Sequence, residues 1–247
     1  MKPIANVEPV ANVEPIVILE HSPEVPPGYL ADAITWADLE AHTVRLYAGD
    51  PLPGLNQLGA VVSLGGVMGA YDDDEHPFLV AEKVYLREAV ALGIPVLGIC
   101  LGCQMLAEAL GGRAFLAGQV EVGFAGLRLE AGGAADPVVG TLASPVVSFH
   151  QDTWEPPPGA TVLATSDRYP HAFRLGSALA IQSHPEASPE IVDRWVEGFG
   201  RDRLEQAGVD PDAFLASVRR GAVGNENRAT ELFRAWLREV ELRSRTA

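Results

Sequence analysis

The chain has 247 residues, and 47% of them are hydrophobic, which is enough to fill a sizeable core and excludes a wholly disordered protein. Asp and Glu number 33 against 18 Lys and Arg, giving a net charge of −15 with no run of basic residues. Because phosphate backbones and anionic lipids repel such a surface, we expect neither nucleic acid nor a membrane as a partner. The two cysteines cannot form a disulfide framework, so we expect a reducing, cytoplasmic compartment.

Residues 1–14 contain two near-copies of a hexapeptide, PIANVE and PVANVE. Solenoid repeats need units of about 20 residues or more, so this duplication does not build a repeat domain. Pro and Glu interrupt every apolar pair, which excludes the apolar core of a signal peptide. We predict a mobile N-terminal arm over 1–14.

Strand and helix signals alternate from residue 15 onward. Short apolar runs predict buried strands, and longer segments with apolar residues at helical spacing predict helices between them. The expected strands are 16–19, 43–47, 60–64 and 95–99, and the expected helices are 78–92 and 101–110. In 78–92 the apolar residues are Leu79, Val80, Val84 and Val90, and the charged ones are Glu82, Lys83, Arg87 and Glu88. Such alternation is typical of an α/β fold, an open, mainly parallel twisted sheet flanked by helices in three flavodoxin-like layers.

The later part of the chain changes character. Short strands separated by turns, typical of antiparallel additions to the sheet, are expected at 123–130, 145–149, 161–165, 171–175 and 179–182. Ser188 followed by Pro189 is a strong helix start, and the rest reads as helices with breaks near 208–211 and 221–225. We predict one α/β domain over 15–187 and a helical extension over 188–247 that packs on it.

An uncharged stretch over 89–107 approaches the length of a membrane span, which is about 20 residues. Gly93, Pro95, Gly98 and Gly102 interrupt any single helix there. The stretch is therefore interpreted as a buried strand followed by a buried helix.

The most informative segment is VLGICLGCQ at 96–104. Cys100 stands between Gly98 and Gly102 in a G-x-C-x-G pattern. This pattern predicts a nucleophile elbow, a sharp strand-to-helix turn that presents the central side chain and tolerates no side chain at either glycine. The helix beginning at Leu101 directs unpaired N–H groups and its positive dipole end at the sulfur, which favours the thiolate.

Two other strand ends carry groups that a thiol nucleophile needs. His184 and Glu186 follow the last predicted strand and supply a base and a carboxylate to orient it. The diglycine Gly65-Gly66 also follows a predicted strand. Because the carboxyl ends of parallel strands line the ligand crevice, its backbone can approach a substrate there.

Together these motifs resemble the class I (triad) glutamine amidotransferase family, in particular stand-alone members similar to the glutaminase part of GMP synthase. GICLGCQ at 98–104 resembles the family's G-x-C-x-G-x-Q, HPE at 184–186 its His-x-Glu pair, and LGG at 64–66 its oxyanion-strand glycines. FHQDTW at 149–154 and AFR at 172–174 are weaker matches. The resemblance spans about 15–187, and Val67, Gln151 and Cys103 depart from the family's usual proline, glycine and alanine.

The resemblance implies hydrolysis of glutamine to glutamate and ammonia through a thioester on Cys100. It implies that His184 moves the protons, that Glu186 orients His184, and that the backbone N–H groups of Gly66 and Leu101 form the oxyanion hole. The residues that it places against the substrate are Gly65, Gln104, His150 and Gln151. It implies neither a cofactor nor a metal ion.

Several rival interpretations rest on other residues. Cys100-x-x-Cys103 fits a redox or metal pair, but no second pair completes a zinc site, so we retain only reversible inactivation by oxidation. A family of cysteine peptidases and chaperones places His where this chain has Leu101. The acidic run at 72–75 is interpreted as a solvated helix start and not as a metal site. Trp154, with three prolines at 156–158, is interpreted as a rigid surface turn.

Two other functions stay open. A γ-glutamyl hydrolase acting on a γ-glutamyl amine or peptide needs the same three residues, with a pocket open beyond the scissile amide. An inactive regulatory or binding subunit is the alternative from another class. The sequence contains no GxxxxGK[ST] phosphate loop. For the ammonia we therefore predict either a separate synthetase subunit or simple release by a hydrolase.

Overall fold

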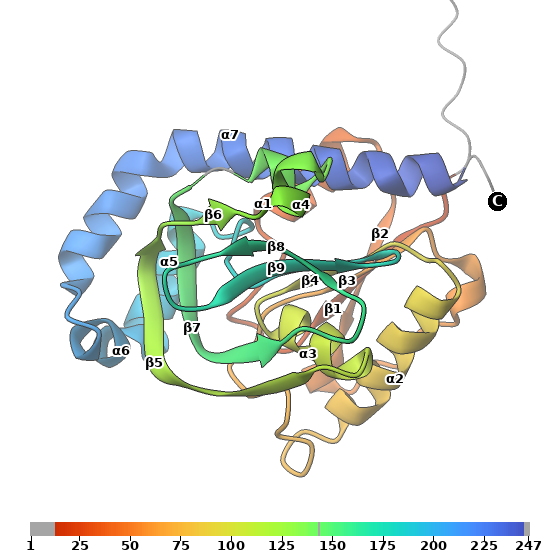
Figure 1. Cartoon of the computed structure of the whole chain (residues 1–247), viewed down its shortest axis with the longest axis horizontal. Coiled ribbons are helices and arrows are strands. Elements are labelled where there is room, and N and C mark those ends of the chain that lie inside the picture. The colour runs from red at the N-terminus through yellow and green to blue at the C-terminus, as the bar shows by residue number, and fades with distance from the viewer. Residues whose placement is uncertain (1–12, 143, 245–247) are drawn as a thin grey trace, which may run out of the picture.

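The computed structural model describes residues 13–142 and 144–244. Its main element is an eight-stranded sheet in the order β2-β1-β3-β4-β10-β9-β8-β6 (Figure 1). The strands from β2 to β10 run parallel, and the last three are antiparallel. Their bounds are β1 Ile16–Glu20, β2 Ala41–Arg45, β3 Ala60–Ser63, β4 Val96–Ile99, β6 Arg128–Leu129, β8 Thr161–Thr165, β9 Pro170–Leu175 and β10 Ala178–Ile181.

Helices cover both faces of this sheet, as the α/β interpretation predicts. The helices α1 (Tyr29–Trp36) and α7 (Pro211–Ser244) lie on one face, and α2 (Phe78–Ala91) and α3 (Leu101–Ala109) lie on the other (Figure 1). The shorter helices are α4 Ala131–Ala135, α5 Pro189–Trp195 and α6 Arg201–Gln206, with 3₁₀ turns at Leu46–Ala48, Leu55–Gln57 and Val139–Thr141 and a π-helical turn at Val196–Gly200. The predicted fold class is confirmed.

Burial on both faces explains why the parallel strands read as continuous apolar runs. In β1, Ile16 and Ile18 pack toward α1 and α7, whereas Val17 and Leu19 pack toward α2 and α3. Successive side chains of a strand point to opposite faces, so a strand covered on both sides has no polar face. The sequence pattern thus places β1 in the middle layer.

The phase of α2 differs from the one suggested by its apolar residues. Val80 and Val84 are 49% and 38% exposed, whereas Glu82 is fully buried. Leu79 and Leu86 form the apolar contact with the sheet. A carboxylate therefore lies inside the protein beside the strand ends, where it needs hydrogen-bonding partners.

A second, two-stranded antiparallel sheet pairs β5 (Arg113–Ala125) with β7 (Val146–Glu155). Both strands are longer than the predicted segments. The interpretation of Trp154 as a surface turn is wrong, because Trp154 belongs to β7 and is only 2% exposed. Its ring packs against Phe173 with centroids 4.9 Å apart. Burial of this large apolar ring keeps Trp154 in the core, although the prolines at 156–158 indicate a turn after it.

The C-terminal region is helical, and its long helix is continuous. The predicted break near 208–211 is confirmed by the turn between α6 and α7, but the predicted break at 221–225 is wrong. Gly221 and Gly224 lie inside α7, and a Cβ at either position would meet only a flexible side chain, that of Asn225 or Arg228. Apolar residues pack on both sides of these glycines, namely Phe214, Leu215, Val218, Ala229, Leu232, Phe233 and Trp236. This packing offsets the low helix propensity of glycine.

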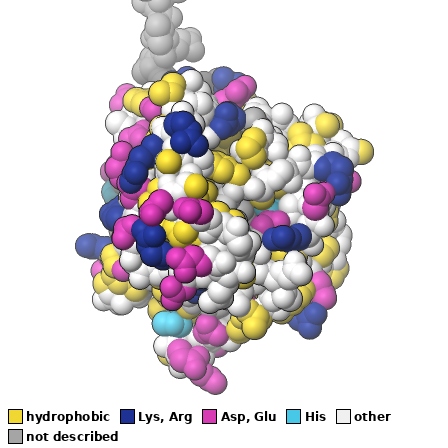
Figure 2. Space-filling model, turned by 90° about the vertical axis from the view of Figure 1, so that its left-hand side faces the viewer, with side chains coloured by type: hydrophobic (Ala, Val, Ile, Leu, Met, Phe, Trp, Pro, Cys, Tyr) yellow, Lys and Arg dark blue, Asp and Glu magenta, His cyan; other side chains and the backbone are white. Residues whose placement is uncertain are grey.

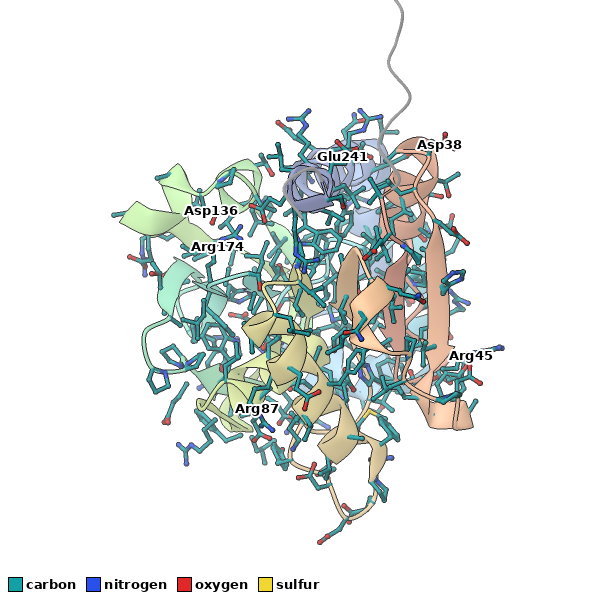
Figure 3. All side chains as sticks on the ribbon, turned by 90° about the vertical axis from the view of Figure 1, so that its right-hand side faces the viewer. Asp38, Arg45, Arg87, Asp136, Arg174 and Glu241 are labelled. Carbon is teal, nitrogen blue, oxygen red and sulfur yellow. The ribbon has the colours of Figure 1, made fainter. Side chains whose placement is uncertain are left out.

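An ion-pair network fastens α7 to the antiparallel end of the sheet. The Arg174 guanidinium contacts Asp136 at 2.6 Å and Glu239 at 3.1 Å, and Figure 3 labels Arg174 and Asp136 side by side. Burial lowers the pKa of Arg174, but the two carboxylates raise it more strongly.

The predicted division of the chain at residues 14 and 187 stays a prediction. The predicted N-terminal arm lies outside the described residues except for Val13 and Glu14.

The surface carries both signs of charge. On the face shown in Figure 2, acidic and basic side chains lie next to one another, most densely toward the left-hand side. No helix among residues 13–142 and 144–244 has the length and apolar character that a membrane span requires.

Candidate active site

Cys100 occupies the sharp turn between β4 and α3. Its backbone has φ +53°, a left-handed conformation that costs energy for a residue with a side chain. A Cβ at Gly98 would collide with the carbonyl of Gly102, and one at Gly102 would collide with the carbonyl of Ser63. The Cys100 N–H donates to Ile181 O at 2.9 Å, which ties the turn to β10. The glycine spacing is therefore a steric requirement of this turn.

The pairing of β10 with β4 brings His184 to the same sheet edge. Ile181 lies opposite Ile99 in the parallel register, so both chains leave the sheet together. The His184 N–H donates to Val147 O at 2.9 Å. The imidazole lies close enough to the Cys100 sulfur for the sulfur to raise its pKa, and its Nδ1 lies 2.6 Å from Glu186 Oε1. The structure thus brings the sulfur, the imidazole and the carboxylate together.

The His184 imidazole is strongly perturbed by its neighbours. Burial lowers its pKa, but the Glu186 carboxylate and then the Cys100 sulfur raise it, to a net value of about 10. His184 and Glu186 are 5% and 0% exposed, so water screens this interaction little. The imidazole is therefore held in its charged form next to the sulfur.

The diglycine lies against this trio. A Cβ on Gly65 would come within 3.1 Å of His184 Cε1 and 3.6 Å of Cys100 Cβ, so the backbone approaches both groups closely. Gly66, Cys100 and Leu101 line one cavity of about 210 Å³. Leu101 opens α3, where N–H groups have no acceptor within the helix.

The other predicted substrate residues lie at the same cavity in different ways. Gln151 is exposed at its wall. The Gln104 amide nitrogen donates to Asp152 O at 3.3 Å and to Gln182 Oε1 at 3.2 Å, so both of its hydrogens are used within the protein. The His150 side chain is 1% exposed and turns into the interior, leaving the backbone at 150–151 toward the cavity.

Three cavity residues were missed by sequence reasoning. Tyr71 donates its hydroxyl hydrogen to Asp152 Oδ1 at 3.1 Å, and this bond joins segments 81 positions apart. Burial raises the pKa of the Asp152 carboxyl. Arg203, from α6, lies with its guanidinium 5.8 Å from the ring centroid of Phe199. Asp152 lies within the weaker FHQDTW match, but no local motif marks Tyr71 or Arg203, because these residues meet only through the tertiary fold.

A buried cluster of Glu121, His150 and His171 lies behind the cavity wall. Among the described residues, it is the one grouping whose ligand atoms are close enough to hold a metal ion. Glu121 Oε2 is 2.6 Å from His171 Nε2 and 3.1 Å from His150 Nε2, which are hydrogen-bond distances. Ser166 donates to the other carboxylate oxygen at 2.7 Å. Burial raises the pKa of Glu121, but these hydrogen bonds lower it more strongly and hold it well below its usual range.

Replacing this carboxylate is expected to destabilise the fold. Glu121→Gln replaces an acceptor of several buried hydrogen bonds by an amide that cannot accept all of them, so we expect unfolding to become easier by about 2 kcal/mol at pH 7. Because the folded pKa is depressed, this difference should disappear as the pH falls below 4.5. Urea unfolding measures the change in the free energy of unfolding for Glu121→Gln and for the exposed control Glu155→Gln. A change of about 0–1 kcal/mol in both variants would contradict the prediction.

The rival residues have ordinary structural surroundings. Cys103 is fully buried, and burial raises its pKa well above the usual thiol value, which disfavours redox chemistry there. Asp73 pairs with Lys83 at 2.7 Å. Asp72 accepts a hydrogen bond from Gly69 N–H at 2.7 Å and lines the cavity.

Comparison with known proteins identifies the family. The model for glutamine amidotransferase class-I matches residues 55–196, which is more than half of the chain. The chain belongs to this family. The resemblance seen in the sequence is thereby confirmed, and Cys100, His184 and Glu186 lie within the matched segment.

Curated relatives and solved structures agree with this assignment. The glutamine amidotransferase-like protein YfeJ of Salmonella typhimurium is 28% identical over 85% of this chain and 91% of its own length. The glutamine-hydrolyzing GMP synthase of Thermus thermophilus is 40% identical over 49% of this chain, which spans only 24% of that enzyme. A crystal structure of a Thermotoga maritima glutamine amidotransferase is 28% identical with a TM-score of 0.82, and the match covers 93% of this chain and 99% of that one. Because the match covers 93% of this chain, the similarity extends into the C-terminal helical region.

Proposed function

We propose that this class-I glutamine amidotransferase hydrolyses the side-chain amide of glutamine to glutamate and ammonia through a thioester on Cys100. The observation that carries the proposal is that Cys100 and His184 both lie against Gly65, with the His184 imidazole held by Glu186 at 2.6 Å. A charged imidazole beside a thiol at the start of a helix favours the thiolate, which is the nucleophile.

The proposed reaction has two halves, formation of the thioester on Cys100 and its hydrolysis by water. The sulfur attacks the amide carbon, and the oxyanion accepts hydrogen bonds from the N–H groups of Gly66 and Leu101, each worth about 3–4 kcal/mol in comparable sites. His184 donates a proton to the nitrogen as the C–N bond breaks and ammonia leaves. Water then loses a proton to His184 and attacks the thioester, releasing glutamate and the thiol.

The cavity has charges suited to the other end of glutamine. Asp72, Asp152 and Arg203 all line it. We infer that the carboxylates attract the α-ammonium group and that Arg203 binds the α-carboxylate. A guanidinium matches the planar geometry of a carboxylate. Gly65, Gln104 and the backbone at His150 and Gln151 complete the proposed substrate site.

Removing the Arg203 charge is expected to weaken glutamine binding with little change in chemistry. A lost charge-assisted hydrogen bond corresponds to about 1.5–3 kcal/mol, so Arg203→Gln should raise KM about 10- to 100-fold while kcat changes less than about threefold. The control is Arg201→Gln, since Arg201 pairs with Glu197 and Asp212 at the surface. Steady-state kinetics with glutamine measure both constants, and an unchanged KM for Arg203→Gln would exclude this role.

The destination of the ammonia is a second part of the proposal. The chain matches a segment of an enzyme named glutamine-hydrolyzing GMP synthase that spans 24% of its length. We infer that a separate synthetase subunit consumes the ammonia. The chain acting alone as a hydrolase is the alternative, and glutaminase activity that rises on mixing with a synthetase would distinguish the two.

The decisive experiment is mass spectrometry after incubation with a diazo-ketone analogue of glutamine. One adduct on Cys100 and none on Cys103 is the expected result. A panel of glutamine and γ-glutamyl amines then separates glutamine use from γ-glutamyl hydrolysis. A protein with no adduct and no turnover of any member of the panel would instead be an inactive binding subunit.

A further inference from the structure

A buried polar network lies directly behind the diglycine. His21 follows β1, Ser63 ends β3, and Glu82 comes from α2, and all three side chains are fully buried. His21 Nε2 is 2.7 Å from Glu82 Oε2, and the Ser63 hydroxyl donates to Glu82 Oε1 at 2.7 Å. The other imidazole nitrogen, Nδ1, lies 3.2 Å from the carbonyl oxygen of Gly65.

The partners of His21 determine its protonation. A carboxylate and a carbonyl are both acceptors, so each ring nitrogen must carry a hydrogen to bond them. Burial lowers the pKa of His21, but the Glu82 carboxylate and the carbonyls of Gly65 and Leu64 raise it more. These partners favour the charged form of His21, with Nδ1 donating to the Gly65 carbonyl and Nε2 facing Glu82.

The bond to Gly65 has a consequence on the opposite side of the same peptide. The Gly65 carbonyl and the Gly66 N–H belong to one planar trans unit, in which they point in opposite directions. Fixing the carbonyl toward His21 therefore directs the Gly66 N–H away from His21. Gly66 lines the cavity that contains Cys100, and Gly65 lies against Cys100 and His184.

We propose that His21, held by Glu82 and Ser63, is a positioning residue that fixes the Gly65–Gly66 peptide so that the Gly66 N–H points into the cavity at Cys100. A charged donor on the carbonyl also polarises the peptide and strengthens its N–H as a donor. The inference rests on the proposed function for its catalytic consequence, because Gly66 is one of the two proposed oxyanion donors. Its geometric part concerns the peptide alone.

Two neutral replacements of His21 separate positioning from mere stabilisation. The nitrogen of an Asn side chain takes the place of Nδ1 and can keep the bond to Gly65, whereas that of Gln takes the place of Nε2 and can keep the bond to Glu82. His21→Asn should therefore be less stable, because Glu82 Oε2 loses its His21 partner and the buried carboxylate keeps only the bond from Ser63. His21→Gln should be more stable than His21→Asn but should lose the hydrogen bond to the Gly65 carbonyl that orients the Gly65–Gly66 peptide.

We expect the less stable variant, His21→Asn, to be more active than the more stable variant, His21→Gln. For His21→Gln we expect kcat to fall about 10- to 100-fold with KM changed less than about threefold, since an oxyanion donor acts in the transition state. His21→Asn should retain kcat within about threefold of the wild type. A purely structural role predicts the reverse order, with the more stable His21→Gln the more active, and that result would overturn the proposal.

A second readout needs no turnover. The chain has three Gly-Gly peptides, 65–66, 111–112 and 132–133, so protein made with ¹³C-carbonyl and ¹⁵N glycine shows one doubly labelled NMR signal for each. The 65–66 signal should shift in His21→Gln and stay near its wild-type position in His21→Asn, with the other two unchanged in both. An unmoved 65–66 signal in His21→Gln would refute the inference even if the wild type hydrolyses glutamine. If the wild type does not hydrolyse glutamine but the signal moves as expected, only the proposed function fails.

Discussion

Cys100→Ala is expected to lower glutamine hydrolysis by at least about 10⁴-fold, because Cys100 supplies the thiol among the described residues that line the cavity. The fold should be affected little, by about 1 kcal/mol or less, since the sulfur lies at the cavity and alanine keeps the rest of the turn. Initial rates of ammonia release and thermal unfolding of the purified variant measure the two effects.

The matched control is Cys103→Ala, three positions further along the same helix. Cys103 packs in the core on the opposite side of the sheet from Cys100, so its loss should leave kcat within about threefold of the wild type. Retained hydrolysis in Cys100→Ala, or equal losses in the two variants, would disprove the assignment of Cys100 as nucleophile. Equal alkylation of Cys100 and Cys103 by the glutamine analogue would also contradict the assignment of Cys100 as nucleophile.

Glu186→Gln is expected to lower kcat by about 10³- to 10⁴-fold, because the amide no longer stabilises a charged imidazole. The Glu186 carboxylate is the strongest of the influences that raise the pKa of His184 to about 10, so the variant's pKa should fall toward or below 6.5. The His184 ring should therefore lose its proton at lower pH in the variant than in the wild type. Titration of the His184 ring signals by NMR between pH 5 and 11 measures this shift.

The same change has a defined effect on stability. His184 has a folded pKa above its unfolded value of 6.5, so its stabilising contribution is complete below pH 6.5 and is lost as the pH rises toward 10. The difference in unfolding free energy between wild type and Glu186→Gln should accordingly shrink from pH 6 to pH 10. Glu190→Gln is the control, since Glu190 bonds Ser188 at the surface. If the two variants had the same pH profile, the Glu186 partnership would be excluded.

The layers and the elbow were predictable because their causes are local. Strand β1 reads as an apolar run since both of its faces are covered, and the glycines around Cys100 reflect clashes with the Gly102 and Ser63 carbonyls. Helix α7 was only partly predictable. Gly221 weakens a helix by its own propensity, but packing on the sheet decides the outcome.

The polar network behind the site was not predictable from the sequence. Glu82 belongs to the charged set of an amphipathic-looking helix, and only the docking of α2 against β1 and β3 shows that it is fully buried. His21 carries no motif at all. Its partners lie 44 and 61 positions away, at distances that depend on the order of the strands.

The sequence by itself determined the strand burial, the turn at Cys100 and the family, since steric clashes and hydrophobic periodicity act over a few neighbouring residues. Only the tertiary structure decided that Arg203 shares the cavity, that His21 lies behind Gly65, and that Trp154 is buried. The physical reason is that burial and hydrogen bonding depend on which strand ends meet, and strand order is a property of the whole sheet.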